Sequence, residues 1–171
     1  MIIIAPADII SQLKNSNSNQ NQANRLCFLS ERQNILKNKD QAIMMLKEAI
    51  SLDSENPSAL TLLAAVLNEQ NSSECVKLYE KAISINTQFY LAYRGLGNYY
   101  LKTKQYEKSE LNYARAIKIN PTRFGPIYKN RAIVRLEQQK NQEAKEDLKN
   151  YLKFTPKAKD RGIIEQEIRK L

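Results

Sequence analysis

The strongest constraint on the fold of this chain is an internal repeat. The segments KEAISLD, EKAISIN and ARAIKIN are nearly the same, and they begin at residues 47, 80 and 114. Their starting points therefore lie 33 and 34 residues apart. A period of this length is typical of an array of similar small units, each of which buries its apolar face only by stacking on its neighbours.

The unit at residues 90–123 shows how one repeat is built. Its first apolar face carries Tyr93, Leu96, Gly97 and Tyr100, and its second carries Ser109, Tyr113 and Ala116. These spacings of three and four residues predict two amphipathic helices, joined by a short polar turn and ended by Asn120 and Pro121. Gly97 lies where the two helices must come close, because any side chain there would push them apart.

The same arrangement occurs at residues 23–56, 57–89 and 125–158. This arrangement closely resembles the pattern of the tetratricopeptide repeat family. In that pattern the first helix carries a large residue, then Leu, then Gly or Ala, then Tyr. The second helix carries Ala, an aromatic residue and Ala, and Pro follows it. Residues 90–123 match this pattern at nearly every position, whereas the first repeat matches weakly, with Ser30 and Gln33 at two helix positions. The resemblance implies an all-α, right-handed superhelical solenoid of antiparallel helix pairs.

The two ends of the chain differ from the repeats. Residues 1–22 hold an apolar segment, Met1 to Leu13, and most of an asparagine-rich stretch, Asn15 to Asn24, which we expect to be a disordered linker. The apolar segment is expected either to dock on a partner chain or on the repeats, or to be a frayed tail. Residues 159–171 carry an apolar stripe of Ile163, Ile164, Ile168 and Leu171. By the family resemblance, this stripe predicts a helix that caps the last repeat near Tyr151.

The residue composition excludes most chemistry. The chain has no histidine, so it lacks the usual general base and the commonest metal ligand. Its two cysteines, Cys27 and Cys75, are too few for a zinc site and are expected to be small core residues. Gly95, Leu96 and Gly97 lie within an expected helix rather than in a phosphate-binding loop. We therefore expect no enzyme, no cofactor and no metal site.

The longest apolar block, at the N-terminus, is too short and too interrupted to span a bilayer. It also lacks the basic region and the cleavage site of a signal peptide. A cytoplasmic location, or the stroma or matrix of an organelle, is the resulting expectation.

The resemblance also implies a binding site. In the family, the first helix of each repeat lines an inner groove that holds a peptide or protein segment. At such positions this chain has its candidate peptide-binding residues, Arg94, Asn98, Lys102, Lys129 and Asn130. In chaperone-binding members, a basic residue and two asparagines at the positions of Arg94, Asn98 and Asn130 form part of a clamp for a C-terminal carboxylate. The match is incomplete, because the last basic positions of that clamp fall near Asp160 and Ile164.

Positive charge gathers in the second half of the chain. Residues 1–89 carry 8 Lys and Arg against 9 Asp and Glu, whereas residues 90–171 carry 19 against 9. This asymmetry fits an acidic peptide, a nucleic acid, or simply a solvated helical surface. The favoured function is a protein-binding scaffold with a basic groove, acting as an adaptor, co-chaperone or assembly factor.

The alternative is a nucleic-acid-associated scaffold that uses the basic second half. Binding to single-stranded nucleic acid also needs exposed aromatic rings on which bases can stack. The aromatic residues of this half that could plausibly be exposed are Tyr90, Tyr99, Tyr106 and Phe124. No base-reading pattern of a helical-repeat protein is visible among them.

Overall fold

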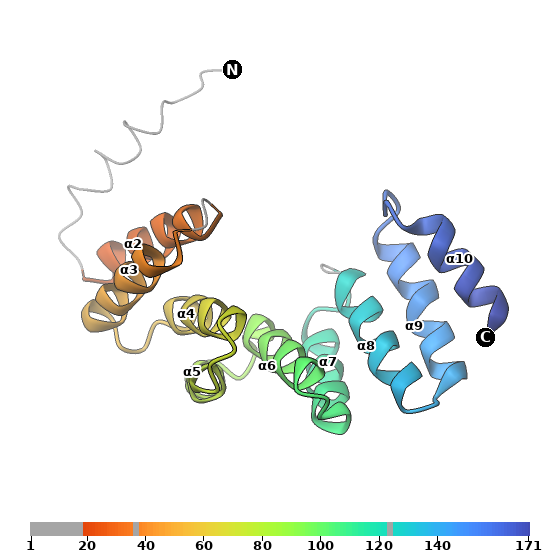
Figure 1. The fold of residues 1–171 in the computed structure, drawn as a ribbon. Coiled ribbons are helices and arrows are strands. Elements are labelled where there is room, and N and C mark those ends of the chain that lie inside the picture. Colours follow the sequence, from red (N-terminus) through yellow and green to blue (C-terminus); the bar gives the residue numbers. More distant parts are fainter. Residues whose placement is uncertain (1–18, 36–37, 123–124) are drawn as a thin grey trace, which may run out of the picture. The chain divides into compact units, whose positions relative to one another are not determined.

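The computed structural model describes residues 19–35, 38–122 and 125–171. Within these ranges every regular element is an α-helix (Figure 1). The helices are α2 (Asn19–Ile35), α3 (Lys39–Leu52), α4 (Pro57–Glu69), α5 (Glu74–Ile85), α6 (Tyr90–Lys102), α7 (Tyr106–Ile119), α8 (Gly125–Glu137), α9 (Asn141–Phe154) and α10 (Arg161–Lys170). The prediction of an all-α fold with a C-terminal helix is confirmed.

The helices belong to two compact units, residues 1–87 and residues 88–171. In the first unit α2 pairs with α3 and α4 with α5, and the second helix of one pair, α3, contacts the first helix of the next, α4. The second unit repeats this arrangement with the pairs α6 and α7, and α8 and α9, followed by α10 against α9. The short turns within pairs make the paired helices antiparallel, as the repeat pattern predicts.

Local sequence explains where several helices begin. The side chain of Asn38 accepts a hydrogen bond from the backbone N–H of Gln41 at the start of α3. Asn56 does the same for Ala59 at 3.0 Å, and Pro57 follows it as the first residue of α4. Asparagine caps satisfy backbone donors that have no partner inside the helix, and proline suits the first turn because its missing N–H is not needed there.

At Gly97, α6 and α7 come close together, as predicted. A Cβ atom added to Gly97 would lie only 2.5 Å from Cε1 of Tyr113, whose side chain is fully buried. The neighbouring Ser109 occupies a position where the family pattern has alanine, and its hydroxyl donates a hydrogen bond of 2.8 Å to the carbonyl oxygen of Gly97. This bond satisfies a polar group that would otherwise be costly to bury.

The expectation of a disordered linker over Asn15 to Asn24 is wrong for residues 19–24, which form the beginning of α2. Ala23 is fully buried in the core of the first unit, and the side chain of Asn24 accepts a hydrogen bond of 3.0 Å from Asn56. The amide side chains stay near solvent while the alanine packs inward, so a polar composition is compatible with a helix anchored at one side. The rest of the linker and the apolar segment Met1 to Leu13 lie outside the described residues.

The C-terminal helix packs on the last repeat through part of its predicted stripe. Ile164 is buried in a cluster with Tyr128 and Tyr151, and Ile168 and Leu171 are partly buried against the same cluster. Ile163 does not take part, since 70% of its side chain is exposed. Spacings of four and three residues place Ile164, Ile168 and Leu171 on one face of α10, and Ile163 lies outside that face.

Both cysteines are buried, as expected for core residues. Burial is the main cause that raises the pKa of the Cys27 thiol, to about 11. Among the described helices, none combines the length and the apolar character that crossing a membrane requires.

Candidate functional site

All five candidate residues belong to the second unit. Arg94, Asn98 and Lys102 lie on α6, and Lys129 and Asn130 lie on α8. The side chain of Lys102 is exposed and the other four are half-buried. Residues four apart share one side of a helix, so Arg94, Asn98 and Lys102 follow one line along α6.

The structure brings Asn98 and Asn130 together. The side-chain oxygen of Asn98 accepts a hydrogen bond of 2.7 Å from the hydroxyl of Tyr113 and one of 3.2 Å from the amide nitrogen of Asn130. With its oxygen engaged twice, Asn98 can offer a ligand only the N–H donors of its amide group. We call Asn98, Asn130 and Tyr113 the amide cluster.

Arg94 lies near enough to the amide cluster to act on it electrostatically. Burial raises the pKa of the Tyr113 hydroxyl above its ordinary value, and hydrogen-bonding neighbours together with the positive charge of Arg94 oppose that rise. A guanidinium and amide N–H groups on one face are a suitable set of donors for a carboxylate, which accepts hydrogen bonds from several directions.

Lys129 is engaged elsewhere. Its ammonium group forms an ion pair of 2.5 Å with Asp160, the residue before α10, and lies 5.7 Å from the centre of the Tyr151 ring. The hydroxyl of Tyr151 donates a hydrogen bond of 2.6 Å to the other oxygen of Asp160. The carboxylate of Asp160 is therefore shared by two partners, and it makes no capping bond to α10.

The electrostatics of this contact follow from its hydrogen bonds. Those from Lys129 and Tyr151 lower the pKa of Asp160, and the bond to Asp160 raises the pKa of Tyr151 to about 12. An acidic residue thus stands where a carboxylate clamp would need a basic one, and it neutralises the nearest lysine of the candidate site.

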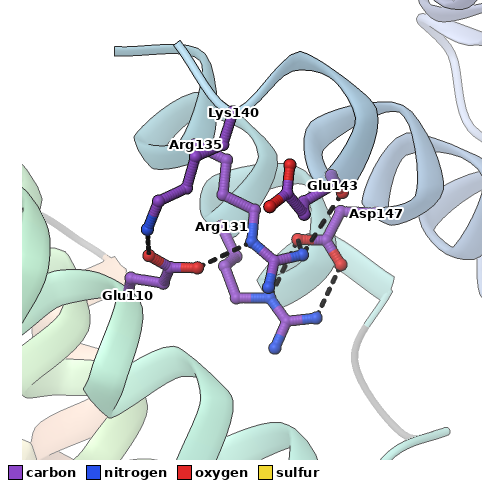
Figure 2. A network of polar contacts seen from close by, with 6 residues as sticks. All are labelled: Glu110, Arg131, Arg135, Lys140, Glu143 and Asp147. Atoms are coloured by element: carbon purple, nitrogen blue, oxygen red, sulfur yellow. Dashed lines mark hydrogen bonds and ion pairs between the residues drawn. The ribbon is translucent and has the colours of Figure 1, made fainter. Parts of the chain in front are cut away.

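An ion-pair network in the second unit was not predicted (Figure 2). Arg131 of α8 binds both oxygens of Asp147 of α9, at 2.8 and 2.6 Å. Arg135 bonds to Asp147 at 2.9 Å and to Glu110 of α7 at 2.8 Å, and Lys140 bonds to Glu110 at 2.6 Å. The network thus ties α7 of one helix pair to both helices of the next.

Two arginines of this network stand where the preceding repeat has Leu96 and Tyr100. Charged groups on a packing face need opposite charges nearby, because an unpaired buried charge is costly. That replacement in the repeat pattern was the feature from which a buried acidic partner such as Asp147 could have been predicted.

The α6 and α8 side carries groups that could bind a ligand. Ile133 is exposed on α8 three residues after Asn130, so an apolar side chain lies beside the amide cluster. In the part of the chain that the structure describes, no group of three or more Cys, Asp and Glu residues could hold a metal ion. Two cavities lie in the first unit, and one of them, of about 370 Å³, is lined by residues that include Asn24, Asp53 and Asn56.

Comparisons with known proteins agree with the repeat pattern. Residues 90–123 match the sequence model of the tetratricopeptide repeat. Anaphase-promoting complex subunit 3 of Schizosaccharomyces pombe is 32% identical over 109 residues, which are 60% of this chain but only 16% of that protein's length.

Solved structures share the fold at low identity. One, from a functional characterization of Pseudomonas aeruginosa pilF, is 19% identical with a TM-score of 0.78, and the match covers 89% of this chain and 71% of that one. Another is a chain of the APC/C hetero-tetramer Cut9–Hcn1, 16% identical with a TM-score of 0.79, covering 95% of this chain and 33% of that one. The repeat match, the curated relative and the shared fold together support a tetratricopeptide repeat protein.

Proposed function

We propose that the chain is a protein-interaction scaffold that holds a peptide or protein segment on the α6 and α8 side of its second unit. The observation that carries this proposal is the hydrogen bond between Asn98 and Asn130, next to the charge of Arg94. The ligand that this arrangement fits is a segment with a carboxylate for Arg94 and the amide donors, and an apolar side chain for Ile133. The role would be that of an adaptor, a co-chaperone or an assembly factor.

The test is a binding comparison on the full chain. Partners are captured with the wild type, and synthetic peptides from their sequences are then measured with a free and with an amidated C-terminus. Arg94→Ala should weaken binding of the carboxylate-bearing peptides by about 1–3 kcal/mol, the range for a charge-assisted hydrogen bond. Lys118→Ala is the matched control, because Lys118 is an exposed cation on α7. Equal effects of the two variants would mean that only net charge matters and would contradict the proposal.

The alternative function, a nucleic-acid-associated scaffold, draws on the basic second half of the chain. Two observations weaken it. The hydroxyl of Tyr106 donates a hydrogen bond of 3.0 Å to Glu137, which places a carboxylate beside a ring that should stack on bases. Several cations of this half, among them Arg131 and Arg135, are already paired with acidic side chains. Binding to RNA or DNA that falls steeply as salt rises would favour the alternative.

A further inference from the structure

The first helix of the structure has a face that no described helix covers. Among the described helices, α2 contacts only α3 and α4 (Figure 1). The corresponding face of α4 belongs to the buried core, where Ala59, Leu63 and Val66 pack in one cluster with Leu46 and Ala49 of α3. The residues 34 positions earlier, on α2, are Arg25, Leu29 and Arg32, and none of these is buried. Among the described residues, nothing fills the position that a preceding helix would take.

This open face is hollow and partly apolar. A cavity of about 270 Å³ is lined by Gln22, Arg25, Leu26 and Leu29 of α2 and by Glu48 and Leu52 of α3. Two large apolar side chains of the same unit are strongly exposed, Phe28 at 58% and Met44 at 71%. Met44, Glu48 and Leu52 are four apart and so follow one line along α3, and Phe28 lies three residues after Arg25 on α2.

One polar atom on this face lacks a partner. Nε of Arg25 is buried and makes no hydrogen bond among the described residues. A buried donor without an acceptor is destabilising. A segment that covers this face with apolar side chains and also supplies a hydrogen-bond acceptor would therefore stabilise it.

We propose that residues 2–13 of the same chain cover this face. They contribute Ile2, Ile3, Ile4, Ile9, Ile10 and Leu13, and Asp8 is the one acidic residue of the stretch. Pro6, Ala7 and Asp8 form a typical start of a helix, which would put Ile9, Ile10 and Leu13 on one side. That side packs on Leu26, Phe28 and Leu29, and Asp8 supplies the acceptor for Arg25.

The length of the connection supports this occupant. In the sequence, four residues, 15–18, separate Lys14 from Asn19, the first described residue of α2. Connections of four residues, 53–56 and 86–89, also join the helix pairs, and across the first of these α3 reaches the buried face of α4. The preceding segment can therefore reach the equivalent face of α2 without further chain.

The test is photo-crosslinking in the full-length protein with p-benzoylphenylalanine in place of Phe28, read by peptide mass spectrometry. The expected product is a crosslink to residues 2–13 within one chain. The same amino acid in place of Leu111, an exposed apolar residue of α7, is the control and should not reach that segment. Ile10→Asp should reduce the crosslink yield to the level of this control, whereas Ser11→Asp, on the opposite side of the expected helix, should leave it unchanged.

Other outcomes overturn the proposal. Crosslinks between two chains, with a dimer mass by light scattering, would assign the face to a second copy. Crosslinks only to another protein in a cell extract would assign it to a partner, and crosslinks elsewhere in the chain or none at all would leave residues 2–13 away from the face. Because none of these readouts involves Arg94 or the amide cluster, the result is independent of the proposed function.

Discussion

Arg131 and Asp147 form a bidentate ion pair between α8 and α9, with Nε to Oδ2 at 2.8 Å and Nη2 to Oδ1 at 2.6 Å. The side chain of Asp147 is only 2% exposed, and Arg135 binds the same carboxylate at 2.9 Å. One buried carboxylate therefore binds two guanidinium groups, of which Arg135 also pairs with Glu110. Removing the carboxylate takes away the acidic partner of Arg131, a largely buried cation, which is far more destabilising than the loss of an exposed ion pair.

We expect Asp147→Asn to lower the free energy of unfolding by about 3–5 kcal/mol, the range for a broken buried ion pair. Urea denaturation followed by circular dichroism measures it. Glu146→Gln is the matched control, because Glu146 is the next residue before Asp147 and its carboxylate forms an exposed ion pair with Lys149. The control should change stability by less than about 1 kcal/mol. Equal losses in the two variants would show that the network contributes no more than a surface pair.

Acid should weaken the same network through Glu110. Burial alone would raise its pKa, but hydrogen bonds from Lys140 and Arg135 outweigh burial and lower the pKa below its ordinary value of 4.5. A depressed folded-state pKa contributes stability above the unfolded-state pKa, and this contribution is lost as the pH falls through the folded-state value. The stability difference between the wild type and Glu110→Gln should therefore be constant near neutral pH and shrink below about pH 4.5. Urea midpoints from pH 7 to pH 3 test this, and a difference that grows on acidification would contradict it.

Sequence periodicity predicted the elements of this fold better than their polar contacts. The spacing around Gly97 and Tyr113 was sufficient to place two helices in contact, because a 3.6-residue period identifies which side of a helix is buried. The same period placed Arg131 and Arg135 on a packing face but did not identify their partners. Asp147 and Glu110 come from two other helices, and a contact between helices depends on the tertiary fold.

For the candidate site too, some contacts were predicted from the sequence and others were not. The family resemblance placed Asn98 and Asn130 in one partial carboxylate clamp, and their side chains form a hydrogen bond. The pairing of Lys129 with Asp160 was not predicted, since the turn before α10 lies outside the repeat pattern. Polar composition likewise misled the prediction for residues 19–24, where the inward packing of Ala23 accompanies the helix.

Gly97→Leu should destabilise the second unit. The new side chain would overlap the ring of the buried Tyr113, and overpacking of this kind costs roughly 1–3 kcal/mol or more. Gly162→Ala is the contrasting variant, since a Cβ atom there meets nothing within 4 Å inside α10. It should leave stability unchanged or raise it by up to about 1 kcal/mol, because alanine favours a helix more than glycine does. Thermal denaturation of both variants compares them, and a normal melting temperature for Gly97→Leu would refute the close contact.

Asp160→Asn should strengthen binding of acidic peptides. The substitution removes the carboxylate that neutralises Lys129, and it leaves that ammonium group available beside Asn130. A gain on the order of 1 kcal/mol, about fivefold in affinity, is expected for a partly exposed charge, with a modest loss of stability because the pair is partly exposed. Calorimetric titration with the carboxylate-bearing peptides used for Arg94→Ala provides the measurement, and the gain should shrink as salt rises.

Glu165→Gln is the control for this prediction. Glu165 lies on α10 and forms an exposed pair with Arg161 at 3.2 Å, so its substitution changes the net charge by the same amount without releasing Lys129. Peptide affinity should stay at the wild-type value in this control. An equal gain in both variants would attribute the effect to net charge alone. No gain in Asp160→Asn, with Arg94→Ala still weakening binding, would place Lys129 outside the binding surface and restrict that surface to Arg94 and the amide cluster.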